Sequence, residues 1–198
     1  MKRIALLSVA IVLVISLGAN AYAASPNWNI DHVHSGFYFG VQHIYSTVRG
    51  FFEEYEGTIQ FDPQNLKDGR VTFEVRVKSI NTNHGKRDGH LLSDEFFDAK
   101  RYPVMTFEST GIEHVEGNGY TLEGVLTVKD VSKNVRIPFT FFGVKQNPFN
   151  PKEEVAGFEA SMTIDRLAYH VGTGKFYEMG VVGKEVNILI ALEVIRKK

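Results

Sequence analysis

The sequence contains no cysteine among its 198 residues. The chain therefore offers no disulfide, no thiolate for a metal and no cysteine that could carry a lipid anchor. A protein that is exported without disulfides must be held together by its apolar core. Once a predicted leader is removed, about 175 residues remain, a length that suits one domain.

An excess of charge of one sign is also missing. The chain carries 22 Lys and Arg residues against 23 Asp and Glu residues. Without Lys2 and Arg3, which fall in the predicted leader, the balance is 20 against 23, a net charge of about −3. Such a balance favours neither nucleic acid nor an acidic membrane surface as a partner. Internal repeats and low-complexity tracts are absent as well.

Residues 1–23 have the pattern of a signal peptide. Two basic residues precede an apolar run from Ile4 to Leu17, and Ala21-Tyr22-Ala23 forms a small-x-small cleavage site. The run is shorter than the roughly 20 apolar residues that span a bilayer. We predict cleavage after Ala23, a single domain over residues 24–198, and a periplasmic or secreted location. An uncleaved anchor and a neighbouring cleavage site are the alternatives.

Beyond Pro26, apolar and polar residues alternate along most of the chain, as they do in half-buried strands. Val71, Phe73 and Val75, separated by polar residues, give the clearest example. The pattern predicts strands over residues 37–42, 55–61, 71–78, 104–115, 120–128, 131–143, 155–164 and 182–195.

Strands of this number and length are long for a small sandwich and suit a closed barrel, which has no exposed strand edges. We predict an all-β fold, an antiparallel eight-stranded barrel with a short helix packed on it. A barrel of this size is either filled by side chains or holds one small ligand. Alternation alone does not decide between a packed core and a lined cavity.

Residues 80–103 fit neither a strand nor a hairpin turn. Large apolar residues recur there at helical spacing. They are Leu91, Leu92, Phe96 and Phe97. Asp88 and Ser93 are candidate N-caps, and Pro103 marks a return to extended backbone. The stretch predicts a short amphipathic helix from Asp88 to Asp98, or two helical turns, that covers part of the barrel.

The same stretch carries a family resemblance. Ser79 to Thr82, Arg87 to Asp98 (RDGHLLSDEFFD) and Tyr102-Pro103 resemble the signature segment of the YceI-like family. These are bacterial proteins with a lipocalin-like barrel that bind polyisoprenoid chains. Further matches extend the resemblance over nearly the whole mature chain. They are Asp31 to Ser35, Gly57 to Asp62, Gly124 to Val128, Gly157 to Arg166 and Val182 to Val186.

Two features depart from the family pattern. Asp130 stands where a glycine is usual, in the turn after the strand that ends at Val128, and residues 173–179 do not align. The latter belong to the long irregular segment 165–181, which we expect to lie at one mouth of the barrel and to gate it.

The resemblance implies that the barrel binds, sequesters or carries an isoprenoid quinone or polyprenyl chain in an apolar tunnel in the periplasm. The expected contacts with the lipid tail are the side chains of Phe37, Phe39, Val41, Phe52, Tyr55, Ile59, Phe73, Val75, Leu91, Leu92, Phe96, Phe97, Phe107, Leu126, Phe139, Phe141, Phe158, Met162, Tyr169 and Phe176. The candidates for binding a polar head group are His34, Arg87 and His90.

No cofactor other than the bound lipid and no nucleic-acid partner is expected, whereas transient membrane contact and a homodimer stay open. His32 and His34 lie on one face of an extended segment, but a zinc site needs further ligands, so we predict no metal site. Neither G-x-S-x-G nor a phosphate-binding glycine loop occurs, so we predict no enzyme.

Two other functions stay open. One is an enzyme acting on a quinone or lipid, in which His90 and Asp88 form a base and its orienting partner. In the structural alternative, Asp88 caps the helix and Arg87 pairs with a carboxylate at the barrel edge. The other function is an interaction domain with a solid core.

Overall fold

The structure, a computed structural model, describes residues 25–198. The predicted leader lies outside the described residues. The strands are β1 (Asn27–Ile30), β2 (Gly36–His43), β3 (Ser46–Phe52), β4 (Tyr55–Gln60), β5 (Arg70–Arg76), β6 (Ile80–Asn81), β7 (Val104–Glu116), β8 (Gly119–Val128), β9 (Val131–Gln146), β10 (Glu153–Asp165) and β11 (Val182–Lys197). The helices are α1 (Gly85–Leu91) and α2 (Lys175–Glu178), and the 3-10 turns are η1 (Leu66–Asp68), η2 (Val77–Ser79) and η3 (Arg166–Tyr169).

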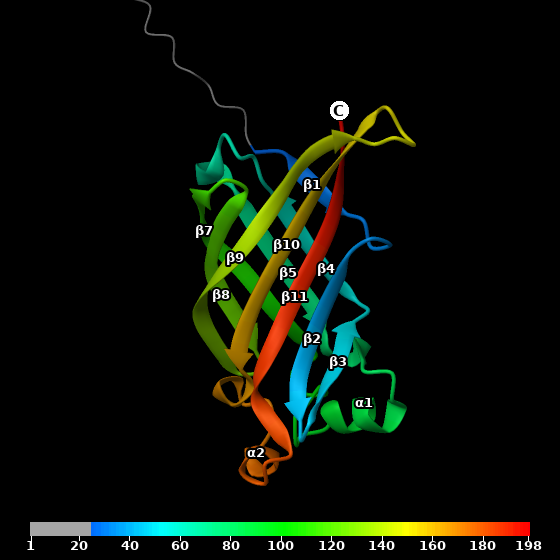
Figure 1. The fold of residues 1–198 in the computed structure, drawn as a ribbon, viewed down its shortest axis with the longest axis vertical. Helices are drawn as coiled ribbons and strands as arrows, with labels where there is room; N and C mark the ends of the chain where they lie inside the picture. Colours follow the sequence, from blue (N-terminus) through cyan, green and yellow to red (C-terminus); the bar gives the residue numbers. More distant parts are fainter. Residues whose placement is uncertain (1–24) are drawn as a thin grey trace, which may run out of the picture.

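Antiparallel pairing closes the sheet into a barrel (Figure 1). The closed ring runs β1-β4-β5-β7-β8-β9-β10-β11 and returns to β1, which pairs with β11 at Asn29↔Ile195 and Ile30↔Val194. The ring has eight strands, so the predicted eight-stranded antiparallel barrel is confirmed. Each predicted strand corresponds to one of the strands found, with small shifts at the ends.

Three strands of the barrel wall are interrupted. β2 continues the course of β1, β3 that of β4 and β6 that of β5, each beyond a short gap. The three continuations pair in the order β11-β2-β3-β6. The sequence pattern did not predict β3. Gly50 lies in its centre, and a side chain there would collide with the ring of Phe39 on β2. The glycine that permits this packing also interrupts the apolar alternation.

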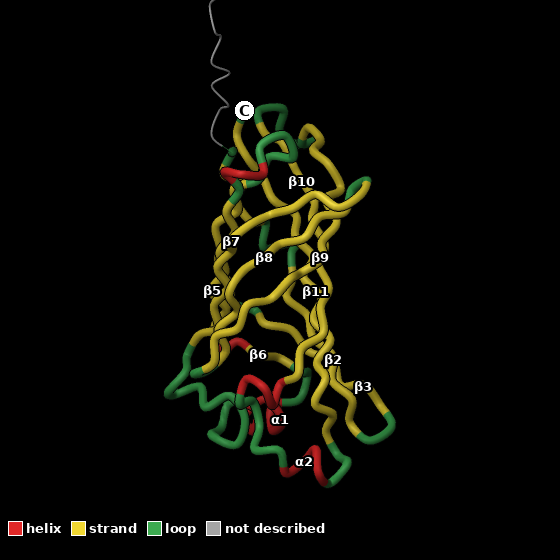
Figure 2. The backbone as a smooth tube through the Cα atoms, turned by 90° about the vertical axis from the view of Figure 1, so that its left-hand side faces the viewer, coloured by secondary structure: helices red, strands yellow, loops and turns green. Residues whose placement is uncertain are grey.

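The two ends of the barrel differ (Figures 1 and 2). The lower end is the one at which the β2–β3 turn, residues 82–103 and residues 166–181 lie, including both α1 and α2. The upper end carries the β9–β10 turn and the C-terminus. Among the described residues, no helix combines the length and the apolar character needed to cross a membrane.

The predicted helix from Asp88 to Asp98 is wrong in its bounds. α1 begins at Gly85, and the Nδ1 atom of its N-cap His84 accepts the N–H of Arg87 at 3.2 Å. Asp88 lies inside the helix, where its carboxylate accepts the N–H of Thr82 at 3.0 Å and also the hydroxyl of Thr82. The carboxylate therefore fastens the chain before the helix, and Asp88 does not cap it. Turns follow from Leu92 to Arg101.

Candidate functional site

The barrel encloses a cavity of about 240 Å³ with an almost entirely apolar wall. One buried water needs only about 10–15 Å³, and an apolar cavity of about 150 Å³ can bind benzene. The interior is therefore not filled by the protein's own side chains, as a solid core would require. Its apolar lining suits a hydrocarbon segment.

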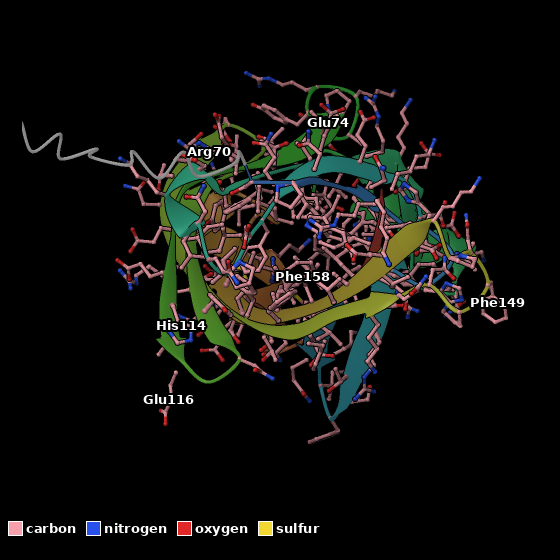
Figure 3. The ribbon with its side chains drawn as sticks, turned by 90° about the horizontal axis from the view of Figure 1, so that it is seen from above. Arg70, Glu74, His114, Glu116, Phe149 and Phe158 are labelled. Carbon is pink, nitrogen blue, oxygen red and sulfur yellow. The ribbon has the colours of Figure 1, made fainter. Side chains whose placement is uncertain are left out.

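Period-two alternation builds this wall. Along β2, Phe37, Phe39 and Val41 face the cavity, and along β5 the inward residues are Val71, Phe73 and Val75. On β5, polar Thr72 and Glu74 lie between the inward residues; Glu74 is on the outer face in the view along the barrel, where Phe158 lies near the middle (Figure 3). Strand geometry in a closed sheet thus decides which side chains face the cavity.

Most residues predicted to contact the ligand lie on the cavity wall. They are Phe37, Phe39, Val41, Phe52, Ile59, Phe73, Val75, Leu91, Phe96, Phe97, Phe107, Leu126, Phe139, Phe158, Met162 and Tyr169. The structure therefore brings them together around one space. Their contact with a ligand stays a prediction.

Four predicted residues do not reach the cavity wall. Tyr55 is buried against the ring of Phe37, with centroids 4.5 Å apart, and Phe141 belongs to an aromatic cluster at the upper end. Leu92 directly follows α1 and is half-buried. Phe176, on α2, stacks on Phe96 at 5.8 Å and covers that ring.

The largest group of wall residues that the sequence analysis missed lies on β11. Val186, Ile188, Ile190 and Leu192 face the cavity in strict alternation. The signal was present in the period-two pattern, but Leu189 and Ala191 on the outer face are also apolar and obscured it. Leu122 on β8 and Ile137 on β9 also face the cavity and were missed, although polar residues flank Leu122 on both sides.

An aromatic cluster closes the upper end of the cavity. Phe61 is 2 % exposed, and its ring lies 5.0–5.9 Å from the rings of four neighbours. These neighbours are Tyr120, Phe139, Phe141 and Phe158. The indole N–H of Trp28 donates to the carbonyl of Phe61 at 3.1 Å and fixes the backbone there. The cavity is therefore blind at this end.

The cover at the lower end consists of two chain segments joined by one lysine. Residues 82–103 contribute Phe96 to the cavity wall, and residues 166–181 contribute Tyr169. The ammonium group of Lys129, in the β8–β9 turn, donates to the carbonyls of Phe96 at 2.7 Å and His170 at 2.6 Å. The expectation that the 165–181 segment lies at a mouth of the barrel agrees with this arrangement.

A second contact reinforces the junction from the same turn. The imidazole of His170 lies 3.1 Å from a carboxylate oxygen of Asp130, and this hydrogen bond lowers the pKa of Asp130. Asp130 is the residue that departs from the family pattern. Lys129, rather than Asp130, has a positive φ of 55° in this turn.

The three predicted head-group residues do not converge on the cavity. Arg87 donates to the hydroxyl and the carbonyl of Thr82, at 2.7 and 2.6 Å, so the expected pairing with a barrel-edge carboxylate is wrong. His90 pairs with Glu95 at 2.6 Å on the surface of the lower end. His34 lies in the break between β1 and β2. None of the three belongs to the cavity wall of the described structure.

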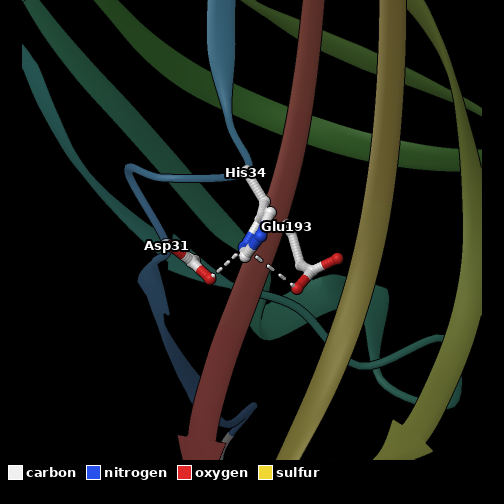
Figure 4. Close-up of side chains that lie close together, drawn as sticks. All are labelled: Asp31, His34 and Glu193. Atoms are coloured by element: carbon white, nitrogen blue, oxygen red, sulfur yellow. Dashed lines mark hydrogen bonds and ion pairs between the residues drawn. The ribbon is translucent and has the colours of Figure 1, made fainter.

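His34 forms an exposed cluster with two carboxylates on the outside of the barrel (Figure 4). Its Nδ1 atom lies 2.8 Å from Asp31 and 3.8 Å from Glu193. The hydrogen bond to Asp31 raises the pKa of His34, and the same bond lowers the pKa of Asp31. His32 does not join this cluster, because its ring packs on Tyr55 at 5.0 Å. Hydrogen bonds from Asp31 and Ser35 to the backbone of Glu193 hold the break between β1 and β2 against β11.

The arrangement required for the alternative enzyme is not present at α1. Asp88 accepts from Thr82, whereas His90 pairs with Glu95. The two residues of the proposed base and orienting partner are therefore each engaged elsewhere in the described structure.

Comparison with known proteins gives consistent results for sequence and fold. A family model described as YceI-like domain matches residues 28–194. The protein YceI of Salmonella arizonae is 32% identical over 180 residues, which are 90% of this chain and 91% of its own. The crystal structure of Burkholderia cenocepacia BcnA superposes with a TM-score of 0.74 at 27% identity, over 85% of this chain and 100% of that chain.

A more distant structure shares the fold alone. It is a polyisoprenoid binding domain from Saccharophagus degradans that is implicated in plant cell wall breakdown. It superposes with a TM-score of 0.62 at 14% identity, over 84% of this chain and 97% of that chain.

Proposed function

The chain belongs to the YceI-like family, and from this we propose that it binds a polyisoprenoid lipid inside its barrel and sequesters or carries it. The observation that carries the proposal is the apolar cavity of about 240 Å³ inside the barrel. The distant structure described as a polyisoprenoid binding domain has the same fold and agrees with this proposal.

Burial of the lipid tail drives the proposed binding. Transferring about 500 Å² of hydrocarbon surface out of water contributes roughly 12 kcal/mol at about 25 cal/mol per Å². Ordering the chain and immobilising the two partners offset a large part of this gain. The preformed wall limits the cost on the protein side, because strands rather than loops hold most of its side chains.

The ligand has one favourable direction in the barrel. Phe61 and its aromatic neighbours close the upper end, so the hydrocarbon terminus of the lipid lies there. The head of an isoprenoid quinone or polyprenyl lipid then lies at the lower end, beneath residues 82–103 and 166–181. These two segments separate to admit the tail.

The proposed location is the periplasm, reached by cleavage of the leader at residues 1–23. A chain that is apolar along its whole length is costly to expose in that aqueous compartment. A barrel that encloses the chain removes this cost during storage or transfer. The chemistry proposed for this protein is binding without turnover.

Loading requires contact with a membrane, and the lower end offers apolar side chains for it. Ile44 and Tyr45 in the β2–β3 turn are 51% and 98% exposed, and Tyr177 and Met179 are 45% and 61% exposed. The N–H of Ile44 donates to the carbonyl of Val181, so the two groups of side chains are adjacent. We propose that this lower-end patch, made of these four residues, touches the bilayer from which the lipid is taken.

The proposal is tested by filling the cavity with one side chain. Ala160 lies on the cavity wall, and the adjacent Ser161 is exposed on the outer face of the same strand. We expect Ala160→Phe to weaken the binding of a long-chain polyprenol, whereas Ser161→Phe leaves it unchanged. Each buried methylene contributes about 0.8 kcal/mol, so excluding one five-carbon unit weakens binding by well over about tenfold.

Binding is measured with radiolabelled polyprenol that elutes with the protein in gel filtration, and circular dichroism checks the fold of each variant. Equal retention of polyprenol by the two variants would place the lipid outside the barrel. If the unsubstituted protein retained no polyprenol, the proposed function would be wrong.

A further inference from the structure

One charged side chain lines the apolar cavity. Arg166, the first residue of η3, is 6% exposed and belongs to the cavity wall at the lower end. Every other wall residue among those described is uncharged. A buried charge is costly unless hydrogen bonds and an opposite charge compensate for it.

Backbone carbonyls hold the guanidinium group, but no carboxylate does. Its Nε donates to Gly183 at 2.8 Å, Nη1 to Val171 at 2.7 Å and Nη2 to Val182 at 3.2 Å. The neighbouring carboxylate of Asp165 is directed elsewhere, 3.4 Å from the ammonium group of Lys184. Within the described structure Arg166 has no ion-pair partner, and burial lowers its pKa.

The hydrogen bonds leave part of the guanidinium group free. Arginine carries five N–H groups, and the three bonds to carbonyls use one on each nitrogen. One N–H remains on Nη1 and one on Nη2. The N–H groups of a planar guanidinium cation match the oxygens of a phosphate or carboxylate.

The surroundings pack closely against this cation and keep it in place. The guanidinium carbon lies 5.8 Å from the centre of the Phe96 ring. At Gly172, which has a φ of +97°, a side chain would collide with Nη1 of Arg166. The site therefore joins the apolar cavity on one side and the two covering segments on the other.

We infer that Arg166 binds the anionic head group of the lipid, so that the preferred ligand is a polyprenyl phosphate rather than a neutral isoprenoid. This inference rests on the proposed function, because it names the head group of the lipid whose tail fills the barrel. It assigns head-group binding to Arg166 in place of the more exposed Arg87 and His90. The anion supplies the direct ion-pair partner that Arg166 lacks, because Asp165 acts on the guanidinium group only from a distance.

The test compares a polyprenyl phosphate with the polyprenol of the same chain length. We expect the unsubstituted protein to bind the phosphate about tenfold or more tightly than the alcohol, as charge-assisted hydrogen bonds to a buried cation require. We also expect inorganic phosphate alone to bind at least about a thousandfold more weakly, because it lacks the tail.

Variants at Arg166 assign the preference to this side chain. Arg166→Met removes the cation, and we expect it to bind the two lipids equally, at the affinity of the alcohol. Arg166→Lys keeps the positive charge but lacks the planar guanidinium group, so we expect it to retain part of the preference for the phosphate. Arg101→Met, at an exposed arginine at the end of the 82–103 segment, is the matched control and keeps the full preference.

Several outcomes overturn the inference. Equal binding of phosphate and alcohol by the unsubstituted protein does so, and this result needs no variant to fold. A preference for the phosphate that persists in a folded Arg166→Met also overturns the inference. Inorganic phosphate that binds as tightly as the polyprenyl phosphate overturns it as well. In the first two cases tight binding of the alcohol leaves the proposed function intact, whereas failure to bind either lipid removes both.

Discussion

Inward-facing glycines make room for phenylalanine rings of the cavity wall. A side chain at Gly50 would collide with Phe39, one at Gly57 with Phe73, and one at Gly124 with Phe107. In each pair the ring lies close to the bare backbone of the adjacent strand. Aromatic rings that lie against glycine stay near the wall and leave the axis of the barrel empty. The glycines thus contribute to the cavity through the rings that they accommodate.

His34 gives a pH-dependent prediction at the scale of single residues. The hydrogen bond to Asp31 raises the pKa of His34, so folding favours the protonated imidazole. The resulting stabilisation is fully present below the ordinary pKa of about 6.5 and is lost as pH rises through the raised pKa. We expect Asp31→Asn to lower the His34 pKa toward about 6.5 in an NMR titration.

Glu193→Gln is the matched control for this titration. Glu193 lies farther from the imidazole and is the smallest contributor to the shift, so its removal changes the His34 pKa less. A larger change in Glu193→Gln than in Asp31→Asn would contradict the assignment of the ion pair.

At the scale of elements, Lys129 in the β8–β9 turn is hydrogen-bonded to both covering segments. Its ammonium group holds the carbonyls of Phe96 and His170, one from each segment. We expect Lys129→Met to loosen both segments and to speed release of a bound lipid. Charge-assisted hydrogen bonds are worth about 1.5–3 kcal/mol, so amide exchange in residues 93–99 and 166–171 should accelerate about tenfold or more.

Hydrogen exchange followed by mass spectrometry measures this effect, and Lys100→Met provides the control. Lys100 is exposed on the same covering segment. Faster exchange confined to one segment, or equal exchange in both variants, would show that Lys129 does not join the two segments.

Strands were more predictable from the sequence than the elements at the lower end. The strands follow from alternation, which is a local property, and all eight predicted strands are present. The start of α1 depends on how Thr82 and Asp88 fold back on each other, which no periodic pattern encodes. The interruption between β3 and β4 falls at Glu53 and Glu54, and no periodic pattern marks it.

The faces of the strands were more predictable from the sequence than the charged part of the cavity wall. Phe39 and Phe73 were assigned to the wall because alternation places each with its apolar neighbours on one face of its strand, and the family resemblance implied that this face points inward. Arg166 was not assigned, because an arginine that follows a strand is exposed in most proteins. Its burial arises from contacts with Val171 and with Gly183, which only the folded chain brings together.

At the scale of the whole molecule, the barrel has a blind upper end and a covered lower end. The lower-end patch adds exposed apolar side chains to the end at which the lipid is expected to leave and return. A carrier that docks through this patch keeps the tail out of water during transfer. The same asymmetry predicts that only one end of the molecule contacts membranes.

Paired substitutions test this polarity. We expect Tyr45→Asp combined with Met179→Asp to reduce sedimentation with phosphatidylethanolamine–phosphatidylglycerol vesicles by about tenfold or more. Full burial of one such side chain contributes about 1.5–3 kcal/mol, and the added charges oppose insertion. Phe149→Asp is the control, because Phe149 is 95% exposed in the turn at the upper end.

An equal loss of sedimentation in Phe149→Asp would show that the molecule has no preferred end toward the membrane. Unchanged sedimentation of the double variant would show that the lower-end patch does not contact the membrane during loading.

The most direct measurement is organic extraction of the mature protein after export by a bacterial host, followed by mass spectrometry of the extract. We predict a polyisoprenoid at close to one molecule per barrel, since a barrel of this size holds one small ligand. Its amount should fall in Ala160→Phe and stay constant in Ser161→Phe. A folded barrel that yields no isoprenoid, or yields equal amounts from both variants, would contradict the claim that the cavity holds the lipid tail.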